Sequence, residues 1–322
     1  MSQIAVSTEP AYFKFASGLE FKLGIAAAIF TTLIWSGFFI AMRAGVTSPL
    51  TAFDLAILRF GLAAVLLLPF TIRAWSTIIA TPKMLLLGIL AGAGVPFFFL
   101  CSIGITYAPA SHAGLLVTGT SPLFIAIAAV VVFKEKLNKQ KVIGLASIGL
   151  GVAALLSLAF WDGNSEYLKG DLIILLAAAC WAIFSICLRV ACLPPLAIAG
   201  FLSLVSTLIL ATLYIAGAVE SGFTVAPAKH IAMQMAIQSV CVGLLAAFSY
   251  GYAINKVGAE RSSAIGSLTP VLVGLMAIPL LGETLTVSAT LGMVLVFLGV
   301  LLSSGIKVAT ILPFNWRRRE QA

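Results

Sequence analysis

Charged side chains are scarce in this chain. Asp, Glu, Lys and Arg make up 9% of its 322 residues, whereas hydrophobic residues make up 61%. An ordinary soluble domain is about 25% charged. With a mean hydropathy of +1.14, the chain has too few polar side chains to coat a water-soluble body. The composition therefore excludes a soluble enzyme or binding domain and indicates that most of the surface faces lipid.

The groups that catalysis and metal binding require are also few. The chain has two histidines and five cysteines, and the cysteines lie in or beside apolar segments without the spacing of zinc ligands. There is no Gly-x-Ser-x-Gly elbow and no His-Glu-x-x-His motif. Segment 114–121 has the spacing of a phosphate-binding loop but lacks its lysine. We predict no catalytic residue, metal site, cofactor or structural disulfide, and the short loops exclude an ATP-driven pump.

Apolar runs fill most of the chain, and each is long enough to cross a bilayer core of about 30 Å as a helix. A helix satisfies its own backbone hydrogen bonds in lipid, and the runs lack the alternation of β-barrel strands. The ten expected spans are 23–44, 52–72, 84–106, 111–133, 142–160, 171–191, 195–217, 231–254, 261–281 and 287–306.

The net charge of +8 comes from basic residues that lie mainly in short gaps between these runs. That placement favours an orientation signal over nucleic-acid binding. If the N-terminus is cytoplasmic, 15 of the 19 basic residues face the cytoplasm, and the three that face outward are Arg43, Lys169 and Lys229. The charge pattern thus predicts a multi-pass protein of a bacterial plasma membrane with both termini cytoplasmic, which requires an even number of crossings.

The two halves of the chain resemble each other. Adding 148 to each number in one set of residues gives an identical or hydroxyl-matched set in the second half. The first set is Ser121, Pro122, Glu135, Leu137, Gly144 and Gly151, and the second is Thr269, Pro270, Glu283, Leu285, Gly292 and Gly299. With an offset of 146, Trp35, Phe38, Arg43 and Pro49 likewise match Trp181, Phe184, Arg189 and Pro195. These matches predict an internal repeat.

Each half contains five crossings, so the second half enters the membrane from the opposite side. Two inverted repeats of this kind are typical of secondary transporters, which bind substrate near the midplane between the halves. We therefore predict an all-α membrane protein with ten transmembrane helices arranged as two inverted five-helix repeats. The expected parts are a cytoplasmic N-terminal segment 1–22, a first repeat 23–160, a linker 161–170, a second repeat 171–306 and a basic cytoplasmic tail 307–322.

The repeated residues resemble the pattern of the drug/metabolite transporter superfamily, EamA-like branch, from about residue 24 to residue 305. The residues that carry the resemblance are Trp35, Phe38, Pro49, Arg59, Ala110, Ala113, Pro122, Leu123, Glu135, Gly144, Gly151, Ala259, Pro270, Val271, Gly282, Glu283 and Gly292. The resemblance implies ten helices, export of amino acids or related small metabolites, and a central cavity lined by helices 1–4 and 6–9. Arg59 has no repeat partner and His112 lies outside the usual pattern, so the resemblance does not identify the substrate.

Aromatic side chains within the spans are the first candidates for substrate binding. Trp35 and Trp181 are repeat equivalents in the middle of their helices, with Phe38 and Phe184 one turn further on. They either pack the core or form the walls of a cavity that suits an amphipathic or cationic metabolite. Tyr250 follows on the eighth helix.

Polar side chains in the spans are expensive in lipid, so each faces a cavity or a hydrogen-bonding partner. Gln238 shares the eighth helix with Tyr250. Ser121-Pro122 and Thr269-Pro270 either expose free carbonyls to a substrate or bend their helices. We predict hinges at Pro96, Pro122 and Pro270.

Two basic side chains leave alternatives open. His112 lies near the outer rim and either forms a hydrogen bond there or titrates and gates access. Arg59 pairs with Asp54, reaches toward the interface, or binds an anion. Glu135 and Glu283 are expected at helix ends on opposite membrane sides, and no Asp or Glu lies at the midplane, so possible proton coupling is not visible in the sequence.

These observations predict a secondary transporter, an exporter of amino acids or related metabolites that works by alternating access. Its expected partners are a small-molecule substrate and the lipid bilayer, not nucleic acid. The alternative is a non-transporting integral membrane protein, such as an assembly factor or an intramembrane lipid-modifying enzyme.

Overall fold

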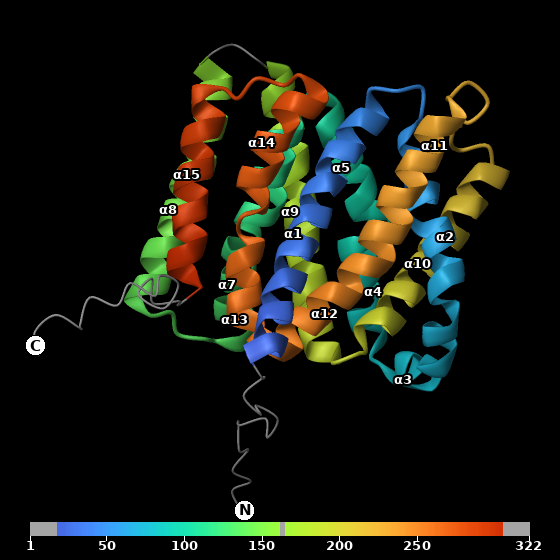
Figure 1. Ribbon diagram of the computed structural model, residues 1–322, viewed down its shortest axis with the longest axis horizontal. Coiled ribbons are helices and arrows are strands. Elements are labelled where there is room, and N and C mark those ends of the chain that lie inside the picture. Colours follow the sequence, from blue (N-terminus) through green and yellow to red (C-terminus); the bar gives the residue numbers. More distant parts are fainter. Residues whose placement is uncertain (1–17, 162–164, 305–322) are drawn as a thin grey trace, which may run out of the picture.

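The computed structural model describes residues 18–161 and 165–304, and within these ranges the chain forms helices and no strands (Figure 1). Gly18 and residue 304 lie at the same end of the bundle, which we call the lower end, as drawn in Figure 1. The opposite, upper end holds the last turn of the first helix.

The first half of the chain crosses the bundle five times. Its helices are α1 (Gly18–Val46), α2 (Ala52–Arg73), α4 (Lys83–Ala93) with α5 (Val95–Tyr107), α6 (Ala110–Ala113) with η1 (Gly114–Gly119) and α7 (Thr120–Phe133), and α8 (Lys139–Trp161). The short helix α3 (Trp75–Ala80) joins α2 to α4 at the lower end.

The second half repeats this plan in the opposite direction. Its helices are α9 (Ser165–Ala191), α10 (Pro195–Ile215), α11 (Ala228–Met235) with η2 (Ala236–Leu245) and α12 (Ala246–Val257), α13 (Ala259–Gly266) with α14 (Thr269–Leu281), and α15 (Val287–Ser303). Among the described residues, nine helical spans are long and apolar enough to cross a membrane, and α15 is a shorter apolar helix. The predicted ten-helix, all-α membrane fold is therefore confirmed.

Some predicted segments fall outside what the structure describes. These are residues 1–17 of the N-terminal segment, 162–164 of the linker, 305–306 of the second repeat and the basic tail 307–322. The largest differences at helix starts are in α1, which begins at Gly18 instead of residue 23, and in α9, which begins at Ser165 instead of residue 171. The early start of α9 moves Asp171 from the expected edge of a span to a position inside a helix.

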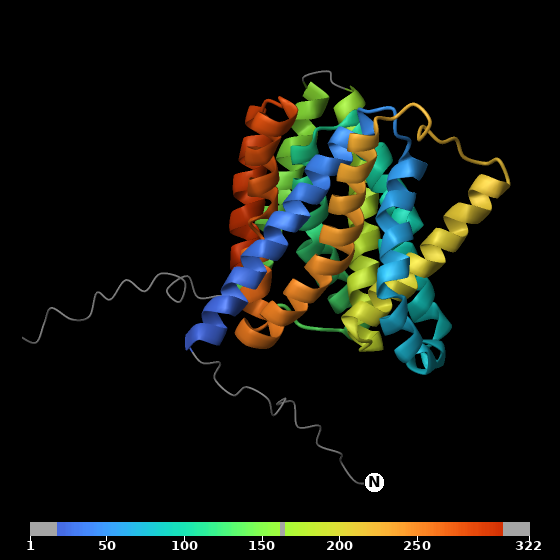
Figure 2. The same cartoon turned by 45° about the vertical axis from the view of Figure 1, so that its right-hand side comes forward.

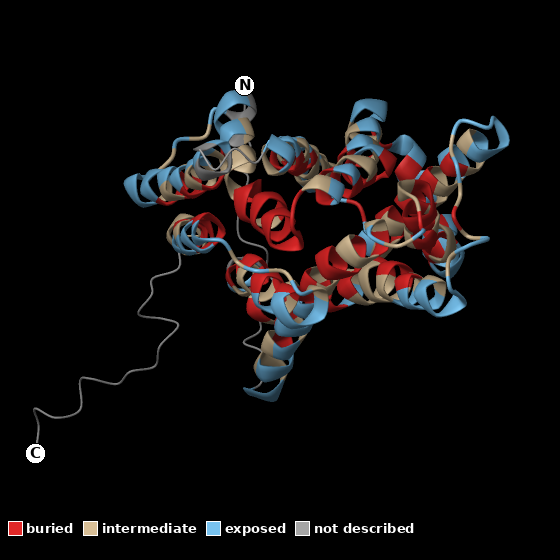
Figure 3. Cartoon of the chain, turned by 90° about the horizontal axis from the view of Figure 1, so that it is seen from above, coloured by how far each residue is buried: buried red, intermediate tan, exposed pale blue. Residues whose placement is uncertain are grey.

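Burial follows the pattern of a lipid-facing bundle (Figure 3). Buried residues gather toward the middle of the bundle when it is viewed from above, and many large apolar side chains at the periphery are exposed. Ile215 and Leu208 are examples on α10, with 84% and 58% exposure. Apolar surface of this extent is stable in contact with lipid rather than water.

Equivalent helices of the two halves contact each other. The fifth and tenth helices, α8 and α15, pack together at one side of the bundle, and the second and seventh, α2 and α10, pack at the other (Figure 1). The first helix runs beside the eighth, α1 against η2 and α12, as Figure 2 shows. The sixth helix, α9, runs beside the third, α4 and α5, in the same way. The bundle therefore has a pseudo-twofold axis that runs between its halves.

Glycines allow α8 and α15 to approach closely and reciprocally. A Cβ added at Gly144 would lie 2.6 Å from the carbonyl oxygen of Gly299, and one at Gly299 would lie 2.6 Å from that of Gly144. Gly151 faces the carbonyl oxygen of Gly292 in the same manner. Such backbone contact is typical of membrane helices with small residues at their interface. The four glycines of the predicted repeat thus form one interface between the two halves.

The backbone is irregular at equivalent places in the two halves. The third crossing breaks at Gly94, just before Pro96, and the eighth contains the π-helix η2. The fourth contains the π-helix η1 before Ser121-Pro122, and the ninth is interrupted between α13 and α14, just before Thr269-Pro270. Irregular turns of this kind are frequent at functional sites. Three of these four places lie beside the predicted hinge prolines, and η2 contains no proline.

Candidate functional site

The two equivalent tryptophans each pack against the opposite half of the chain. The ring of Trp35 lies 4.9 Å from that of Tyr250 on α12. The ring of Trp181 lies 5.3 Å from that of Phe97 on α5 and 5.0 Å from that of Phe184. The structure thus brings Trp35 together with Tyr250, and Trp181 with Phe184, on either side of the pseudo-twofold axis.

Three other predicted substrate-binding residues are engaged locally. Phe38 is buried and makes edge contacts with Phe39 and Phe98. The hydroxyl of Ser121 donates to the carbonyl oxygen of Val117 at 2.6 Å, and that of Thr269 to Gly266 at 2.7 Å. Both hydroxyls donate to backbone carbonyl oxygens three or four residues earlier in the chain, so their contact with substrate stays a prediction.

Arg59 lies within α2 and contacts the π-helix η2. Its Nη1 donates to the carbonyl oxygen of Gln238 at 3.1 Å, and its guanidinium lies 5.5 Å from the centre of the Phe60 ring. Gln238 is fully buried, and its side-chain oxygen has no hydrogen-bond partner among the described residues. In the described part of the chain no carboxylate forms an ion pair with Arg59. The site therefore combines a cation that lacks a counter-ion with an unsatisfied amide oxygen.

Of the three alternatives for Arg59, the ion pair with Asp54 does not form in the described part of the chain. Asp54 is fully buried and caps α2, where its carboxylate accepts from the backbone N–H of Thr51 at 2.8 Å. It also accepts from the hydroxyl of Ser221 at 2.6 Å and the N–H of Gly222 at 2.7 Å. These bonds hold the loop after α10 against the start of α2. The Asp54 carboxylate therefore stabilises the start of α2 rather than the charge of Arg59.

His112 is not an isolated residue at the rim, because its side chain is 2% exposed and has a charged partner. Its Nδ1 lies 2.9 Å from Oδ1 of Asp171, which is fully buried on α9. The other carboxylate oxygen of Asp171 is buried and has no hydrogen-bond partner in the residues that the structure describes. Asp171 is not among the predicted site residues, because it is the first residue of the expected span 171–191.

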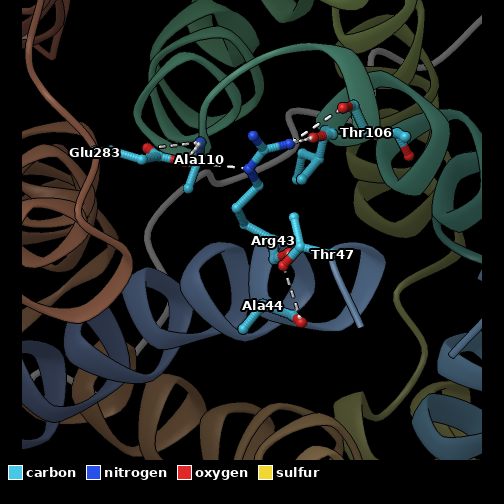
Figure 4. Close-up of polar contacts among 7 residues, drawn as sticks. Arg43, Ala44, Thr47, Thr106, Ala110 and Glu283 are labelled. Atoms are coloured by element: carbon cyan, nitrogen blue, oxygen red, sulfur yellow. Dashed lines mark hydrogen bonds and ion pairs between the residues drawn. The ribbon is translucent and has the colours of Figure 1, made fainter. Parts of the chain in front are cut away.

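A second polar contact joins the two halves at the upper end (Figure 4). Nε of Arg43, at the end of α1, lies 3.3 Å from Oε1 of Glu283, which follows α14. The Glu283 carboxylate also accepts from the N–H of Ala110 at 3.0 Å, and Arg43 donates to the carbonyl oxygens of Ile105 at 2.6 Å and Thr106 at 3.1 Å. The two side chains are 23% and 11% exposed. We call this arrangement the upper latch.

The repeat-equivalent residues form a second ion pair at the lower end. Arg189 is equivalent to Arg43 (43 + 146), and Glu135 is equivalent to Glu283 (283 − 148). Nη2 of Arg189 lies 3.6 Å from Oε1 of Glu135, with side-chain exposures of 68% and 38%. This lower latch is longer and far more exposed than the upper one. The two ends of the molecule therefore carry the same pair of residues, but the pair at the upper end is shorter and more deeply buried.

Two apolar grooves lie on the outside of the bundle. One, of about 390 Å³, runs between α2 and the α11–η2 segment, and the other, of about 230 Å³, lies between α14 and α15. Neither is lined by a predicted substrate-binding residue. The described residues include no cluster of three or more His, Cys, Asp or Glu side chains that would hold a metal ion. The predicted central cavity stays a prediction.

Comparison with known proteins gives a family match over both halves. The model of the EamA-like transporter family matches residues 22–157 and again residues 168–305. The double match confirms the two-repeat architecture that the sequence predicts.

Two curated relatives, both from Bacillus subtilis (strain 168), carry the description of uncharacterized transporter. YyaM is 28% identical over 264 residues, which cover 77% of this chain and 83% of YyaM. YetK is 27% identical over 221 residues, which cover 66% of each chain. One solved crystal structure superimposes with a TM-score of 0.59 at 19% identity, over 87% of this chain and 96% of the other. That similarity supports the fold alone.

Proposed function

Because the chain belongs to the EamA-like transporter family of the drug/metabolite transporter superfamily, we propose that it exports amino acids or related small metabolites by alternating access. In this proposal the lower end faces the cytoplasm of a bacterium, as the distribution of basic residues favours. Substrate binds near the midplane, between the inverted halves. Family membership favours this function over the non-transporting alternative.

The observation that carries the proposal is the inequality of the two latches. Arg43–Glu283 and Arg189–Glu135 join the same two repeat positions across the halves, at opposite ends of the bundle. One is short, largely buried and reinforced by backbone hydrogen bonds, and the other is long and exposed. An inverted repeat that exchanges the conformations of its halves exchanges the states of these latches as well. In this proposal, the form with the short upper latch is closed at its upper end, and a second form has the lower latch closed.

Arg59 supports a proposal for the class of substrate. A guanidinium within a membrane span normally finds a partner or marks a substrate path. Arginine binds carboxylates in bidentate geometry, so a substrate carboxylate would supply the missing negative charge. The aromatic pairs Trp35–Tyr250 and Trp181–Phe184 would contact the apolar part of such a substrate. We therefore propose that the substrate carries a carboxylate next to an apolar group.

Transport by the purified protein in liposomes tests this proposal. Substrates are first identified by a screen for resistance to toxic amino-acid analogues, and their uptake should saturate and be accelerated by substrate on the far side. A carboxylate-containing substrate should compete for uptake, whereas its decarboxylated amine should not. Arg59→Gln should raise the KM for the carboxylate substrate at least tenfold, and the exposed control Lys229→Gln should leave it unchanged.

Three results would contradict the proposal. Absence of flux for every amino acid tested would exclude this substrate class. Conductance that does not saturate would indicate a channel. If the carboxylate substrate and its decarboxylated amine compete equally well, Arg59 does not recognise the substrate carboxylate.

A further inference from the structure

We propose that His112 and Asp171 form a proton-binding site, and that closure of the upper end of the bundle takes up one proton there. The proposal rests on the alternating access proposed above and adds a ligand that drives it. His112 belongs to the first half of the chain and Asp171 to the second, so their contact exists only while the halves meet at this end. Asp171 lies six residues inside α9, about 9 Å along the helix from its start.

The proton balance of the pair follows from its burial. With one proton bound, the pair is neutral overall, either as imidazole with a carboxylic acid or as imidazolium with a carboxylate. Without that proton, a carboxylate remains at a fully buried position with no cation to compensate it. Burying an unpaired charge costs several kcal/mol. The closed upper end therefore holds the proton, and the open end, where water reaches Asp171, releases it.

The orphan oxygen of Asp171 supports this assignment independently. A purely structural His–Asp contact usually has the remaining carboxylate oxygen satisfied by a neighbour, because an unmet buried acceptor is costly. Here Oδ2 has no partner among the described residues. A carboxylic acid that carries its proton on this oxygen no longer presents an unmet charge. Among the described residues, Oδ2 is therefore a position of the pair that can bind a proton.

Other charged or titratable groups at this end do not neutralise Asp171. The groups on the elements packed around the pair are Arg43 of α1, Tyr107 of α5, Glu283 after α14, and Glu166, Tyr167 and Lys169 of α9. Arg43 and Glu283 pair with each other, and Nζ of Lys169 lies 3.9 Å from the centre of the Tyr107 ring. The Tyr167 ring contacts His112 at 5.7 Å. Among the described residues the ion pair of Asp171 is with His112.

The test measures closure directly and needs no substrate. Spin labels are attached to cysteines introduced at Thr47 and Val287, which are exposed at the upper end in different halves. The five native cysteines are replaced by serine or alanine. Pulsed electron spin resonance then gives the populations of the closed and open forms in liposomes between pH 5 and pH 9. Linkage to one proton changes the ratio of open to closed protein by at most tenfold per pH unit, with opening favoured as the pH rises.

Two variants should shift this ratio in opposite directions. Asp171→Asn mimics the protonated acid and should hold the upper end closed with no dependence on pH. His112→Gln removes one of the two groups that can hold the proton and should increase the open fraction at pH 7. A pair that serves only as a structural hydrogen bond would instead lose closure in both variants. His230→Gln, which changes the other histidine at an exposed position, is the matched control and should behave as the unchanged protein.

The outcomes separate this proposal from the one on which it rests. Glu283→Ala breaks the upper latch and should open the upper end at every pH. If it does not, alternating access fails at this end, and the proton site fails with it. Suppose instead that Glu283→Ala opens the upper end, but the ratio of open to closed protein does not depend on pH when His112 and Asp171 are both present. Only the proton site is then refuted. The proton site is also refuted if the Asp171→Asn protein keeps the full pH dependence. The same holds if Asp171→Asn and His112→Gln change the ratio of open to closed protein in the same direction.

Discussion

The upper latch offers the most quantitative prediction. Glu283→Ala removes the ion pair with Arg43 and the acceptor for the N–H of Ala110. A hydrogen bond to a charged group contributes about 1.5–3 kcal/mol, and a partly exposed ion pair contributes up to about 1 kcal/mol. The closed form should therefore lose about 2–4 kcal/mol relative to the open form. That loss corresponds to roughly a 30-fold to several-hundred-fold rise in the ratio of open to closed protein.

The equivalent change at the lower end provides the comparison. Glu135→Ala removes an ion pair whose side chains are 38% and 68% exposed, so it should change the same ratio by less than about fivefold. Spin-label distances between positions 47 and 287 report the upper end in both variants. If the two substitutions change the populations equally, the inequality of the latches has no energetic meaning. The conformational assignment would then be wrong.

Three further predictions concern the scaffold, the cavity and the hinges. Gly299→Leu forces a side chain into the carbonyl oxygen of Gly144. It should lower the yield of folded protein, and it should lower the melting temperature by at least 5 °C. Leu298→Ala, at an exposed neighbouring position, should leave both quantities nearly unchanged. Trp181→Ala should lower transport at least tenfold while the amount of inserted protein stays within twofold, and normal transport would assign Trp181 to packing. Pro122→Ala should change the ratio of open to closed protein more than it changes substrate affinity, as titration of bound substrate alongside spin-label distances would measure.

Helix positions were predictable because a bilayer imposes a length and a polarity on every crossing. Repeated residues such as Pro122 and Pro270 then related the two halves without any knowledge of contacts. The partner of Glu283 was not predictable in this way, since Arg43 lies far from it in the sequence. Only the pseudo-twofold packing brings the end of α1 to the end of α14. The repeat nevertheless contained a usable signal, because both the arginine and the glutamate recur.

The misplaced polar residues have local explanations. Thr51 and Asp54 have the spacing of a capping box, which predicts the start of a helix. The Asp54 carboxylate is used in that cap and does not pair with Arg59. Asp171 was judged by the edge of an apolar window, whereas the helix continues six residues beyond that edge. The π-helices η1 and η2 have no sequence signature of their own, since their turns depend on how neighbouring helices pack. Aromatic contacts such as Trp35 with Tyr250 likewise depend on helix rotation, which hydropathy does not specify.

The glycine contact between α8 and α15 has the form of a homodimer interface contained in one polypeptide. Gly144 meets Gly299 and Gly151 meets Gly292, which is the reciprocal arrangement that two identical subunits adopt around a dyad. Near the dyad, Ser147 donates to the carbonyl oxygen of Leu295, the residue 148 positions later and thus its own counterpart. Each half therefore carries the complete surface that recognises the other. Two separately expressed halves would meet through that surface without the covalent link between them.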